Sequence, residues 1–396
     1  TVVGFGAGGS ESMTVFVERD GAPGRRVRKV LSDALSTVSW DPSGTGVMLP
    51  PFAKARKQAE YLQALPLELR RVFPTVGNIT SRELPVPAHV VADTDAFREV
   101  IYEMTYVPGE EVSRWVERTK PPVEVVSRVY EAVIGVLHRD VHSVHRAPAP
   151  GGTLEEQYFR KIEERLALCR RTAPHTFGAA LLDTEHVIVD GQRLRNIGPL
   201  LNALRSDPEY LDVLEPRVHA LVMGDTNTEN VKLADTTPLR RAQELIERGA
   251  PQPEVDAALA AITADSIGVM FLDPRAIGFR SDGGETRDDP MYDNKPWHNS
   301  IGHYDEMHYE QFDLAVDVAD DGSPVVDVRF HDGNPYQVAY AGMAKRFAPV
   351  MAAVYGADAH GMPVVPDDPY WLVRFVFTMG THFTAMPPFH FTSEVE

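Results

Sequence analysis

The chain has 396 residues, and its 39 lysines and arginines against 57 aspartates and glutamates give a formal net charge of −18. This charge argues against a general affinity for nucleic acid or for anionic membranes, because attraction to those polyanions needs a positive field. The acidity permits a cationic small-molecule substrate, and the length allows two or three domains.

Cys169 is the single cysteine, which excludes intramolecular disulfides and cysteine-rich zinc sites and suits a reducing cytoplasm. No apolar run approaches the roughly 20 residues needed to span a bilayer, and the sequence does not open with a basic and then an apolar targeting segment. We therefore expect a cytoplasmic protein, a monomer or a homodimer, in which Cys169 is a buried structural thiol.

The first 106 residues consist mainly of short β-branched runs separated by Gly-rich and Gly/Pro turns, the pattern of an antiparallel meander. Residues 54–65 have the composition of a helix that ends before Pro66. The expected strands are residues 1–3, 13–18, 26–31, 89–93 and 97–107. This order predicts a β-sheet domain with one helix in residues 1–106, followed by a second domain in residues 107–396.

After Pro108 and Gly109 the pattern changes from strands to helices. Asp190 and Gly191 predict the turn of a hairpin within residues 175–215, which we interpret as an insertion or a cap on the substrate side. The expected helices are residues 112–117, 123–138, 154–171, 338–355 and 370–383.

Residues 4–9 read GFGAGG and satisfy the pattern G-x-G-x-x-G. A dinucleotide site requires such glycines to open a helix, but the following residues, SESMTVFVER, have the pattern of a strand. A strand after the loop favours a β-hairpin lid whose main chain approaches ATP phosphates closely. A dinucleotide fold and a plain turn are the alternatives.

Lys29 lies in the strand-like run RVRKVL, where alternate side chains share a face, so it can point toward the glycine loop. Glu60, on the next predicted helix, is a candidate ion-pair partner for the Lys29 ammonium group. The alternative is that both are surface residues, but their order after a glycine loop favours nucleotide binding.

The segments VMGDTNTENV (222–231) and GVMFLDPR (268–275) carry the most specific pattern. Asp225 is a loop carboxylate, Asn230 follows in the same loop, and Asp273 ends an apolar strand. Phosphoryl transfer needs one carboxylate to orient the attacking hydroxyl and accept its proton, and a carbonyl oxygen with a second carboxylate to hold Mg²⁺. A turn-rich loop with polar caps is the alternative.

With these motifs the sequence resembles the aminoglycoside phosphotransferase and choline kinase superfamily, the small-molecule branch of the protein-kinase-like fold. The resemblance covers most of the chain, including YEMTYVPG (102–109), GDTNTEN (224–230), FLDPR (271–275) and DPMYDNKPWHNSIGHYDE (289–306). It implies an α+β, two-lobed fold, with an N-terminal antiparallel sheet lobe carrying one key helix and a larger, mainly helical C-terminal lobe. It also implies ATP and Mg²⁺ as cofactors, and phosphoryl transfer to a hydroxyl of an antibiotic, a sugar, an amino sugar or another metabolite.

The resemblance further implies roles for single residues. Asp225 would be the catalytic base, Asn230 and Asp273 the Mg²⁺ ligands, and Asp293 the brace of the catalytic loop. The nucleotide would be held by Gly6, Gly9 and Ser10 in the glycine loop, by Lys29 with Glu60, and by main-chain groups near Glu103, Met104 and Tyr106.

Two positions depart from the family pattern. Most relatives have histidine where this chain has Met223, and that histidine supports the catalytic loop by packing and hydrogen bonding. Pro274 and Arg275 follow Asp273, where many relatives carry an aromatic or a second acidic residue. Arg275 is a candidate contact for a phosphate or the substrate, and a structural salt bridge to Asp288 or Asp289 is the alternative.

Histidines and other polar residues crowd into residues 297–308. Candidate substrate contacts in this stretch are His298, His303, Tyr304 and Asp305. A metal site is one alternative, although the five-residue intervals between the histidines do not fall on one helical face, and packing near the active site is another. His138, His142 and His145 have helical spacing, which we interpret as a solvated stripe.

Other functions remain open at this point. A catalytically silent kinase-like module that binds a nucleotide or a partner protein predicts no ATP consumption. A nucleotidyl or dinucleotide-dependent enzyme would need residues 10–20 to be helical. The sequence does not identify the acceptor, because a fold does not specify a substrate. Acidic residues near 282–306 make a cationic acceptor, such as an aminoglycoside, the first hypothesis.

Overall fold

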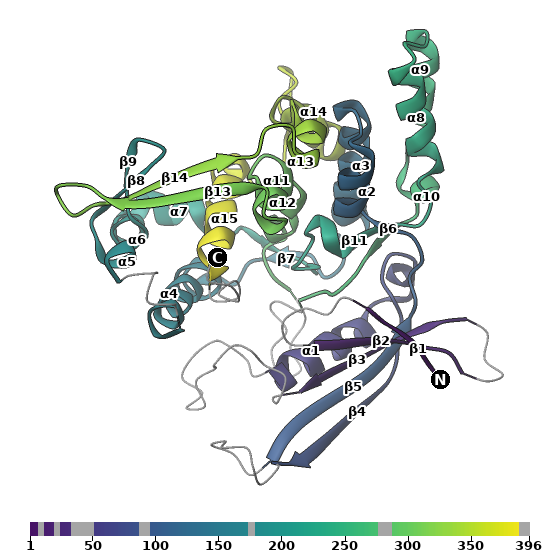
Figure 1. Ribbon diagram of the computed structural model, residues 1–396, viewed down its shortest axis with the longest axis horizontal. Coiled ribbons are helices and arrows are strands. Elements are labelled where there is room, and N and C mark those ends of the chain that lie inside the picture. The colour runs from purple at the N-terminus through teal and green to yellow at the C-terminus, as the bar shows by residue number, and fades with distance from the viewer. Residues whose placement is uncertain are drawn as a thin grey trace.

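The computed structural model describes residues 1–6, 12–19, 24–32, 51–86, 96–172, 179–275 and 287–387 (Figure 1). The N-terminal part is a five-stranded antiparallel sheet in the order β1-β2-β3-β5-β4. Its strands are β1 (Val2–Gly6), β2 (Ser12–Val17), β3 (Arg26–Ser32), β4 (Val76–Pro85) and β5 (Ala96–Thr105). Four of these five strands overlap strands that the sequence predicted.

The glycine loop is followed by a strand and not by a helix. β2 pairs antiparallel with β1, with Gly6 opposite Thr14, and a Cβ at Gly6 would lie 3.0 Å from Thr14 Cγ2. Because a dinucleotide-binding loop opens a helix, the dinucleotide alternative is wrong. Gly9 and Ser10 lie outside the described residues, and so does the strand predicted at residues 89–93.

Helix α1 (Pro51–Ala64) packs on this sheet, as the composition of residues 54–65 predicts (Figure 1). Its small residues Ala55 and Ala59 are buried against Val27, Val100 and Tyr102 of the strands. Alanine keeps the helix close to the sheet and costs little side-chain entropy on burial. The position of α1 brings its polar residue Gln58 to the same carboxylate as Lys29 of the central strand β3.

The sequence pattern does not predict β4, because Gly77, Asn78 and Pro85 are turn-forming residues. The strand nevertheless pairs with β5 from Val76 to Pro85, with one irregularity between Val76 and Ile79. Cross-strand pairing with an apolar neighbour has overridden local propensity here.

The chain leaves the sheet after Thr105 and passes into the helical part at Gly109. This glycine has φ +105°, and a Cβ there would lie 2.2 Å from the carbonyl oxygen of Leu233, so no other residue fits. β6 (Glu110–Glu111) then pairs with β11 (Val231–Leu233), which pairs with β12 (Val269–Phe271). This small sheet holds the connection against the segments that carry Asn230 and Asp273.

Helices form most of the C-terminal part and enclose one large apolar core around α3 (Val123–Val136). Trp115 and Trp297 are fully buried in this core. The expected helices are confirmed, although residues 338–355 are divided by Gly342, which has φ +89°. The other helices here are α2 (Val112–Thr119), α8 (Thr237–Glu247), α9 (Gln252–Ala260), α10 (Ala264–Ile267), α11 (Lys295–Ser300), α12 (Tyr304–His308), α13 (Pro335–Tyr340), α14 (Met343–Tyr355) and α15 (Trp371–Thr384).

A second apolar cluster joins α4 (Arg160–Thr172) to part of the stretch expected as an insertion. Cys169 is fully buried there beside Leu201 and Leu214, and burial raises the pKa of its thiol to about 11. This confirms that Cys169 is structural. The helices of that stretch are α5 (Ala179–Asp183), α6 (Ile197–Ser206) and α7 (Pro208–Leu214).

The hairpin predicted at Asp190 and Gly191 is confirmed and belongs to a four-stranded sheet in the order β13-β14-β8-β9. Its strands are β8 (His186–Val189), β9 (Gln192–Arg195), β13 (Phe312–Val318) and β14 (Pro324–Phe330). β14 pairs parallel with β8, and the other pairings in this sheet are antiparallel. The structure is therefore of the mixed α+β class, with mainly antiparallel sheets.

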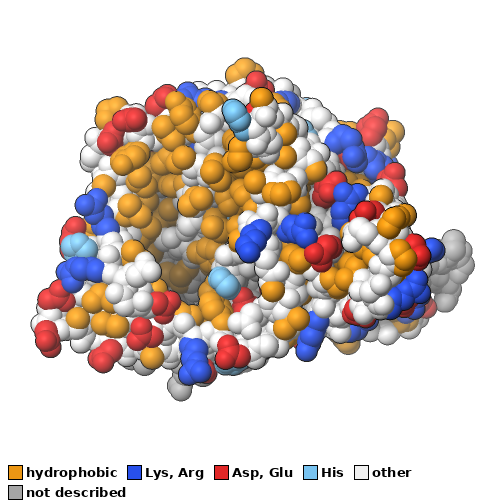
Figure 2. All heavy atoms as spheres, turned by 90° about the horizontal axis from the view of Figure 1, so that it is seen from above, with side chains coloured by type: hydrophobic (Ala, Val, Ile, Leu, Met, Phe, Trp, Pro, Cys, Tyr) orange, Lys and Arg blue, Asp and Glu red, His pale blue; other side chains and the backbone are white. Residues whose placement is uncertain are grey.

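Apolar side chains are also exposed on the surface of the C-terminal part. Figure 2, the view from above Figure 1, shows hydrophobic side chains gathered around a hollow on that face. The exposed apolar residues of the described part include Leu314, Val316 and Val318 on β13 and Leu372, Val373 and Val376 on α15. In the described ranges, no helix has both the length and the apolar character needed to cross a membrane.

Candidate active site

Two loops that are far apart in the sequence meet at the small sheet. Asn230 directly precedes β11, and Asp273 follows the end of β12. Because Val231 is paired antiparallel with Phe271, the start of β11 lies beside the end of β12. The main-chain N–H of Leu272 donates to the carbonyl of Asn230 at 2.7 Å. This pairing brings the loop of residues 222–230 against the segment 271–275.

Asp225 lies between two cationic side chains. Its Oδ1 accepts from Lys295 Nζ at 2.7 Å, and its Oδ2 accepts from Arg275 Nε at 2.6 Å. Burial raises the pKa of the Asp225 carboxyl, but Arg275 and Lys295 outweigh burial and lower it to about 2. Asp225 is therefore a carboxylate at any physiological pH. Arg275 pairs with Asp225. The sequence had offered Asp288 or Asp289 as the alternative partners of Arg275.

Asn230 is oriented by the same loop. Its amide Nδ2 donates to the main-chain carbonyl of Asp225 at 3.1 Å. An amide that uses its nitrogen in this way keeps its oxygen as an acceptor or metal ligand.

Asp273 is joined to the N-terminal sheet through Lys29. Lys29 Nζ donates to Asp273 Oδ1, and Gln58 Nε2 on α1 donates to the same oxygen at 2.8 Å. Tyr102 OH on β5 in turn donates to Gln58 Oε1 at 2.7 Å. Asp273 has φ +55°, a left-handed conformation that non-glycine residues adopt rarely and mostly at sites where the surrounding structure enforces it.

The expected ion pair between Lys29 and Glu60 is wrong. Glu60 pairs on its own helix with Arg56, at 2.7 Å, and its side chain is 37 % exposed. The residue of α1 that joins the Lys29 site is Gln58, which lies on a different face of the helix because each residue advances by about 100°.

Asp293 holds the 222–230 loop from behind, as the resemblance implies. Its carboxylate accepts from the main-chain N–H groups of Met223 at 2.8 Å and Gly224 at 2.6 Å, and its main-chain carbonyl accepts from Thr226 Oγ1 at 2.7 Å. His142 Nε2 lies 2.9 Å from Asp293 Oδ2. His142 is 3 % exposed, so its interpretation as part of a solvated stripe is wrong. An imidazole from a distant helix thus supports the loop that carries Met223 in place of histidine.

Replacing His142 by Leu is expected to lower the free energy of unfolding by about 1–3 kcal/mol, because the buried Asp293 carboxylate loses one of its donors. His360→Leu is the matched control, since His360 is exposed on the surface of the same C-terminal part. Chemical denaturation of both variants measures the effect. Equal stability of the two would show that the contact between His142 and Asp293 contributes nothing.

Main-chain groups near Glu103, Met104 and Tyr106 were expected to hold adenine. The first two residues lie within the sheet, and the third lies beyond it. β5 lies between β3 and β4, and within it Glu103 pairs with Arg28 and Met104 pairs with Val27 and Val76. The Glu103 side chain also bonds to Arg28 and Arg19. Glu103 and Met104 are therefore part of the sheet ladder, whereas Tyr106 follows the end of β5.

Three of the four candidate substrate contacts in residues 297–308 are buried, namely His298, Tyr304 and Asp305. His298 is 3 % exposed, and its Nδ1 lies 3.1 Å from Nδ1 of His382. Asp305 is 1 % exposed and accepts hydrogen bonds from Thr228, Asn299 and Tyr340. Both side chains contact neighbouring groups of the fold, and their expected role as substrate contacts stays a prediction.

The other two candidates differ in their distance from Asp225. His303 bonds to Glu306 at 2.5 Å and stacks on Phe330, away from the 222–230 loop. Burial raises the pKa of the Tyr304 phenol, and the negative charges of Glu229 and Asp225 raise it further. Tyr304 therefore lies near Asp225. In the residues that the structure describes, no group of three or more His, Cys, Asp or Glu side chains could hold a metal ion, so the metal alternative has no support.

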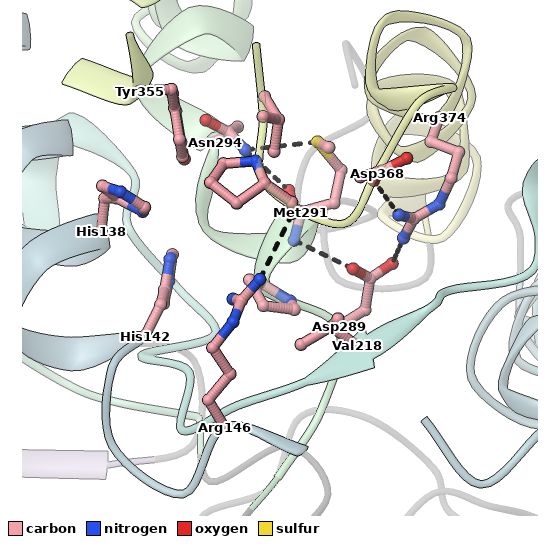
Figure 3. A pocket seen from close by; sticks show the side chains of 13 residues that line it. His138, His142, Arg146, Val218, Asp289, Met291, Asn294, Tyr355, Asp368 and Arg374 are labelled. Carbon is pink, nitrogen blue, oxygen red and sulfur yellow. Dashed lines mark hydrogen bonds and ion pairs between the residues drawn. The ribbon is translucent and has the colours of Figure 1, made fainter. Parts of the chain in front are cut away.

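A small cavity lies behind Asp293. It has a volume of about 40 Å³ and is lined in part by His142, Asp289 and Arg374 (Figure 3). Arg374 lies between Asp289 and Asp368 and bonds to both. A space of this size can hold a few water molecules.

The sequence did not single out three residues of this network: Gln58, His142 as a brace, and Lys295. Each depends on packing between separate elements. Lys295 carried a usable signal, because it stands two residues after Asp293 in the DPMYDNK segment.

A scan against protein-family models finds no match for this chain, and a search of curated proteins finds none either.

Proposed function

We propose that the protein is a Mg·ATP-dependent phosphotransferase that moves the γ-phosphoryl group of ATP to a hydroxyl of a small molecule. The observation that carries this proposal is the joining of Lys29, on the N-terminal sheet, to Asp273, which neighbours Asp225 and Asn230 in the paired loops. Phosphoryl transfer requires a lysine or equivalent cation, metal-binding oxygens and a hydroxyl-orienting carboxylate around one point.

We further assign the chain to the two-lobed, protein-kinase-like arrangement. The five-stranded sheet with α1 would be the N-terminal lobe, and the helical part with the 222–230 loop would be the C-terminal lobe. The connection at Gly109 lies between them. Tyr106 and Val107 stand at the end of β5, which makes this stretch the better candidate for main-chain contacts to adenine than Glu103 and Met104.

The oxygens of Asn230 and Asp273 fit a magnesium ion. Asn230 uses its amide nitrogen within the protein, and among the described residues no donor bonds to Asp273 Oδ2, since Lys29 and Gln58 both use Oδ1. Carboxylate and amide oxygens are ligands that Mg²⁺ prefers. Bound there, Mg²⁺ would neutralise charge on the nucleotide phosphates. Lys29 would then exchange its bond to Asp273 for phosphate oxygens.

Asp225 would orient the attacking hydroxyl. A carboxylate with a pKa of about 2 is a weak base, so its main contribution is to hold the hydroxyl in line and to take its proton late in the reaction. Lys295 and Arg275 fix the position of Asp225 and supply positive charge beside the transferred group.

A screen for ADP release in the presence of Mg·ATP tests the proposal. The acceptors are sugars, sugar acids, sugar phosphates, amino sugars, nucleosides and aminoglycosides, with Asp225→Asn as the blank. We expect ADP release with at least one class of acceptor and phosphate on that acceptor by mass spectrometry. Mg·ATP binding without ADP release for any acceptor would favour the catalytically silent module instead.

Replacing Asp273 by Ala is expected to weaken ATP binding at least about tenfold when Mg²⁺ is present, because a carboxylate ligand of the metal is lost. Without Mg²⁺ the affinity should change little or increase, since Lys29 is freed. Calorimetric titration with and without Mg²⁺ measures both. Affinity that is unaltered in the presence of Mg²⁺ would contradict the role of Asp273.

A further inference from the structure

Two lysines and an arginine form a basic cluster around Asp225 and Tyr292. Lys295 and Arg275 bond to Asp225 directly. Lys161, on α4, bonds to the hydroxyl of Tyr292, and its Nζ lies 4.6 Å from the centre of the Tyr292 ring. Lys295 Nζ lies 5.7 Å from the centre of the same ring. Tyr292 thus joins Lys161 to the Asp225 site.

The carboxylates near these cations do not balance them. Asp225 is shared by two of the three, and the hydrogen bond that Lys161 makes within the described residues is to a neutral phenol. Asp289 is paired with Arg374, and Asp293 is occupied by the 222–230 loop. Asp288 acts on Lys161 electrostatically, but burial raises the pKa of Asp288 to about 7, so its negative charge is only partly present at neutral pH.

An unpaired, partly buried ammonium group is costly, and a ligand anion removes that cost. Burial lowers the pKa of Lys161, and so do the charges of Arg165, Lys295 and Arg275. Solvent can reach the cluster through Arg275, whose side chain is 46 % exposed. The cluster of Lys161, Lys295 and Arg275 is therefore complementary to a negative group and opposes the cationic acceptor expected from the net charge.

Lys161 is distinct from the groups assigned to the nucleotide. Lys29 on β3 bonds to Asp273, whereas Lys161 on α4 bonds to Tyr292, and β3 and α4 are well separated in Figure 1. The γ-phosphoryl group would meet Lys29, Arg275 and Lys295. Lys161 is the additional cation, on the acceptor side.

We propose that the acceptor carries an anionic group, a phosphate or a carboxylate, that binds to Lys161 and Lys295 while its hydroxyl faces Asp225. This inference rests on the proposed phosphotransferase function. It names the class of acceptor that the acidic overall composition would not suggest.

The test uses small anions as probes. The full chain is saturated with a non-hydrolysable Mg·ATP analogue, and its melting temperature is followed against inorganic phosphate, acetate and methylammonium at constant ionic strength. We expect phosphate or acetate to raise the melting temperature in a saturable manner, and methylammonium to have no such effect. Phosphate and acetate distinguish a phosphate-bearing from a carboxylate-bearing acceptor.

Lys161→Met should weaken the apparent binding constant for the effective anion about tenfold, whereas Lys161→Arg should retain it. Arg160→Met is the matched control, because Arg160 is exposed on the same helix and the change in charge is the same. Neither Lys161→Met nor Arg160→Met should alter the affinity for the Mg·ATP analogue by more than about twofold.

Three outcomes would overturn the inference: no saturable effect of either anion, saturation by methylammonium, or equal effects in Lys161→Met and Arg160→Met. A loss of affinity for the ATP analogue in Lys161→Met would also overturn it, since Lys161 would then belong to the nucleotide site. Failure of the wild-type chain to bind the ATP analogue would instead refute the proposed function, and the anion titration without nucleotide would still report on Lys161.

Discussion

Replacing Asp225 by Asn is expected to lower kcat by about 10²- to 10⁴-fold, because the amide orients the hydroxyl poorly and cannot accept its proton. Affinity for Mg·ATP should remain within a few fold, since Asn230, Asp273 and Lys29 are retained. Initial rates of ADP release and calorimetric titration with Mg·ATP measure the two effects. Turnover at the wild-type rate would contradict the role of Asp225.

The same substitution is also expected to destabilise the fold. Lys295 is buried, and removing the charge of its partner costs about 3–5 kcal/mol at neutral pH. Because the pKa of Asp225 is lowered in the folded protein, its ion pairs stabilise the fold above pH ~4 and lose that effect as the pH falls toward 2. The stability difference between wild type and variant should therefore shrink over this range.

The double variant Asp225→Asn/Lys295→Met separates the two effects. It should recover part of the lost stability, because the unpaired ammonium is gone, and it should remain inactive. Recovery of activity together with stability would show that Asp225 acts only by neutralising Lys295.

Replacing Asp293 by Ala is expected to lower the free energy of unfolding by about 3–5 kcal/mol and to abolish most activity. The change leaves the N–H groups of Met223 and Gly224 and the imidazole of His142 without their acceptor in a buried place. The 222–230 loop would then shift and displace Asp225. Denaturation at low temperature, where the variant stays folded, measures the loss.

Asp332→Ala is the matched control for Asp293→Ala, because Asp332 is an exposed aspartate of the same C-terminal part. Its stability and ADP release should equal those of the wild type. Asp293→Asn should be intermediate, since its amide keeps one acceptor oxygen. Wild-type stability in Asp293→Ala would contradict the brace.

Much of the fold follows from local patterns. β-Branched alternation predicted β2, β3 and β5, and composition predicted α1, because these elements bury one face against a neighbour. β4 was missed because its turn-forming residues pair only in the presence of β5. The two-residue turn at Asp190 and Gly191 was readable, because few other dipeptides adopt that turn.

The candidate site was predictable where its residues share one loop. Asp225 and Asn230 lie in a single turn-rich segment, and Asp273 follows the strand that pairs with β11, so these three residues could be singled out from the sequence. The predicted ion pair between Lys29 and Glu60 was wrong, and the role of Gln58 was missed. The choice between these two polar residues of α1 depends on how the helix is rotated over the sheet.

By itself, then, the sequence was enough to indicate an α+β chain and a phosphoryl-transfer pattern in Asp225, Asn230 and Asp273. Only the tertiary structure decided which charges meet. It joined Lys29 to Asp273, enclosed Asp225 between Lys295 and Arg275, and placed His142 behind the loop, so that positive charge surrounds Asp225 in a chain of net charge −18. The physical reason is that a substrate meets the local field of the few groups packed around it, and composition averages that field away.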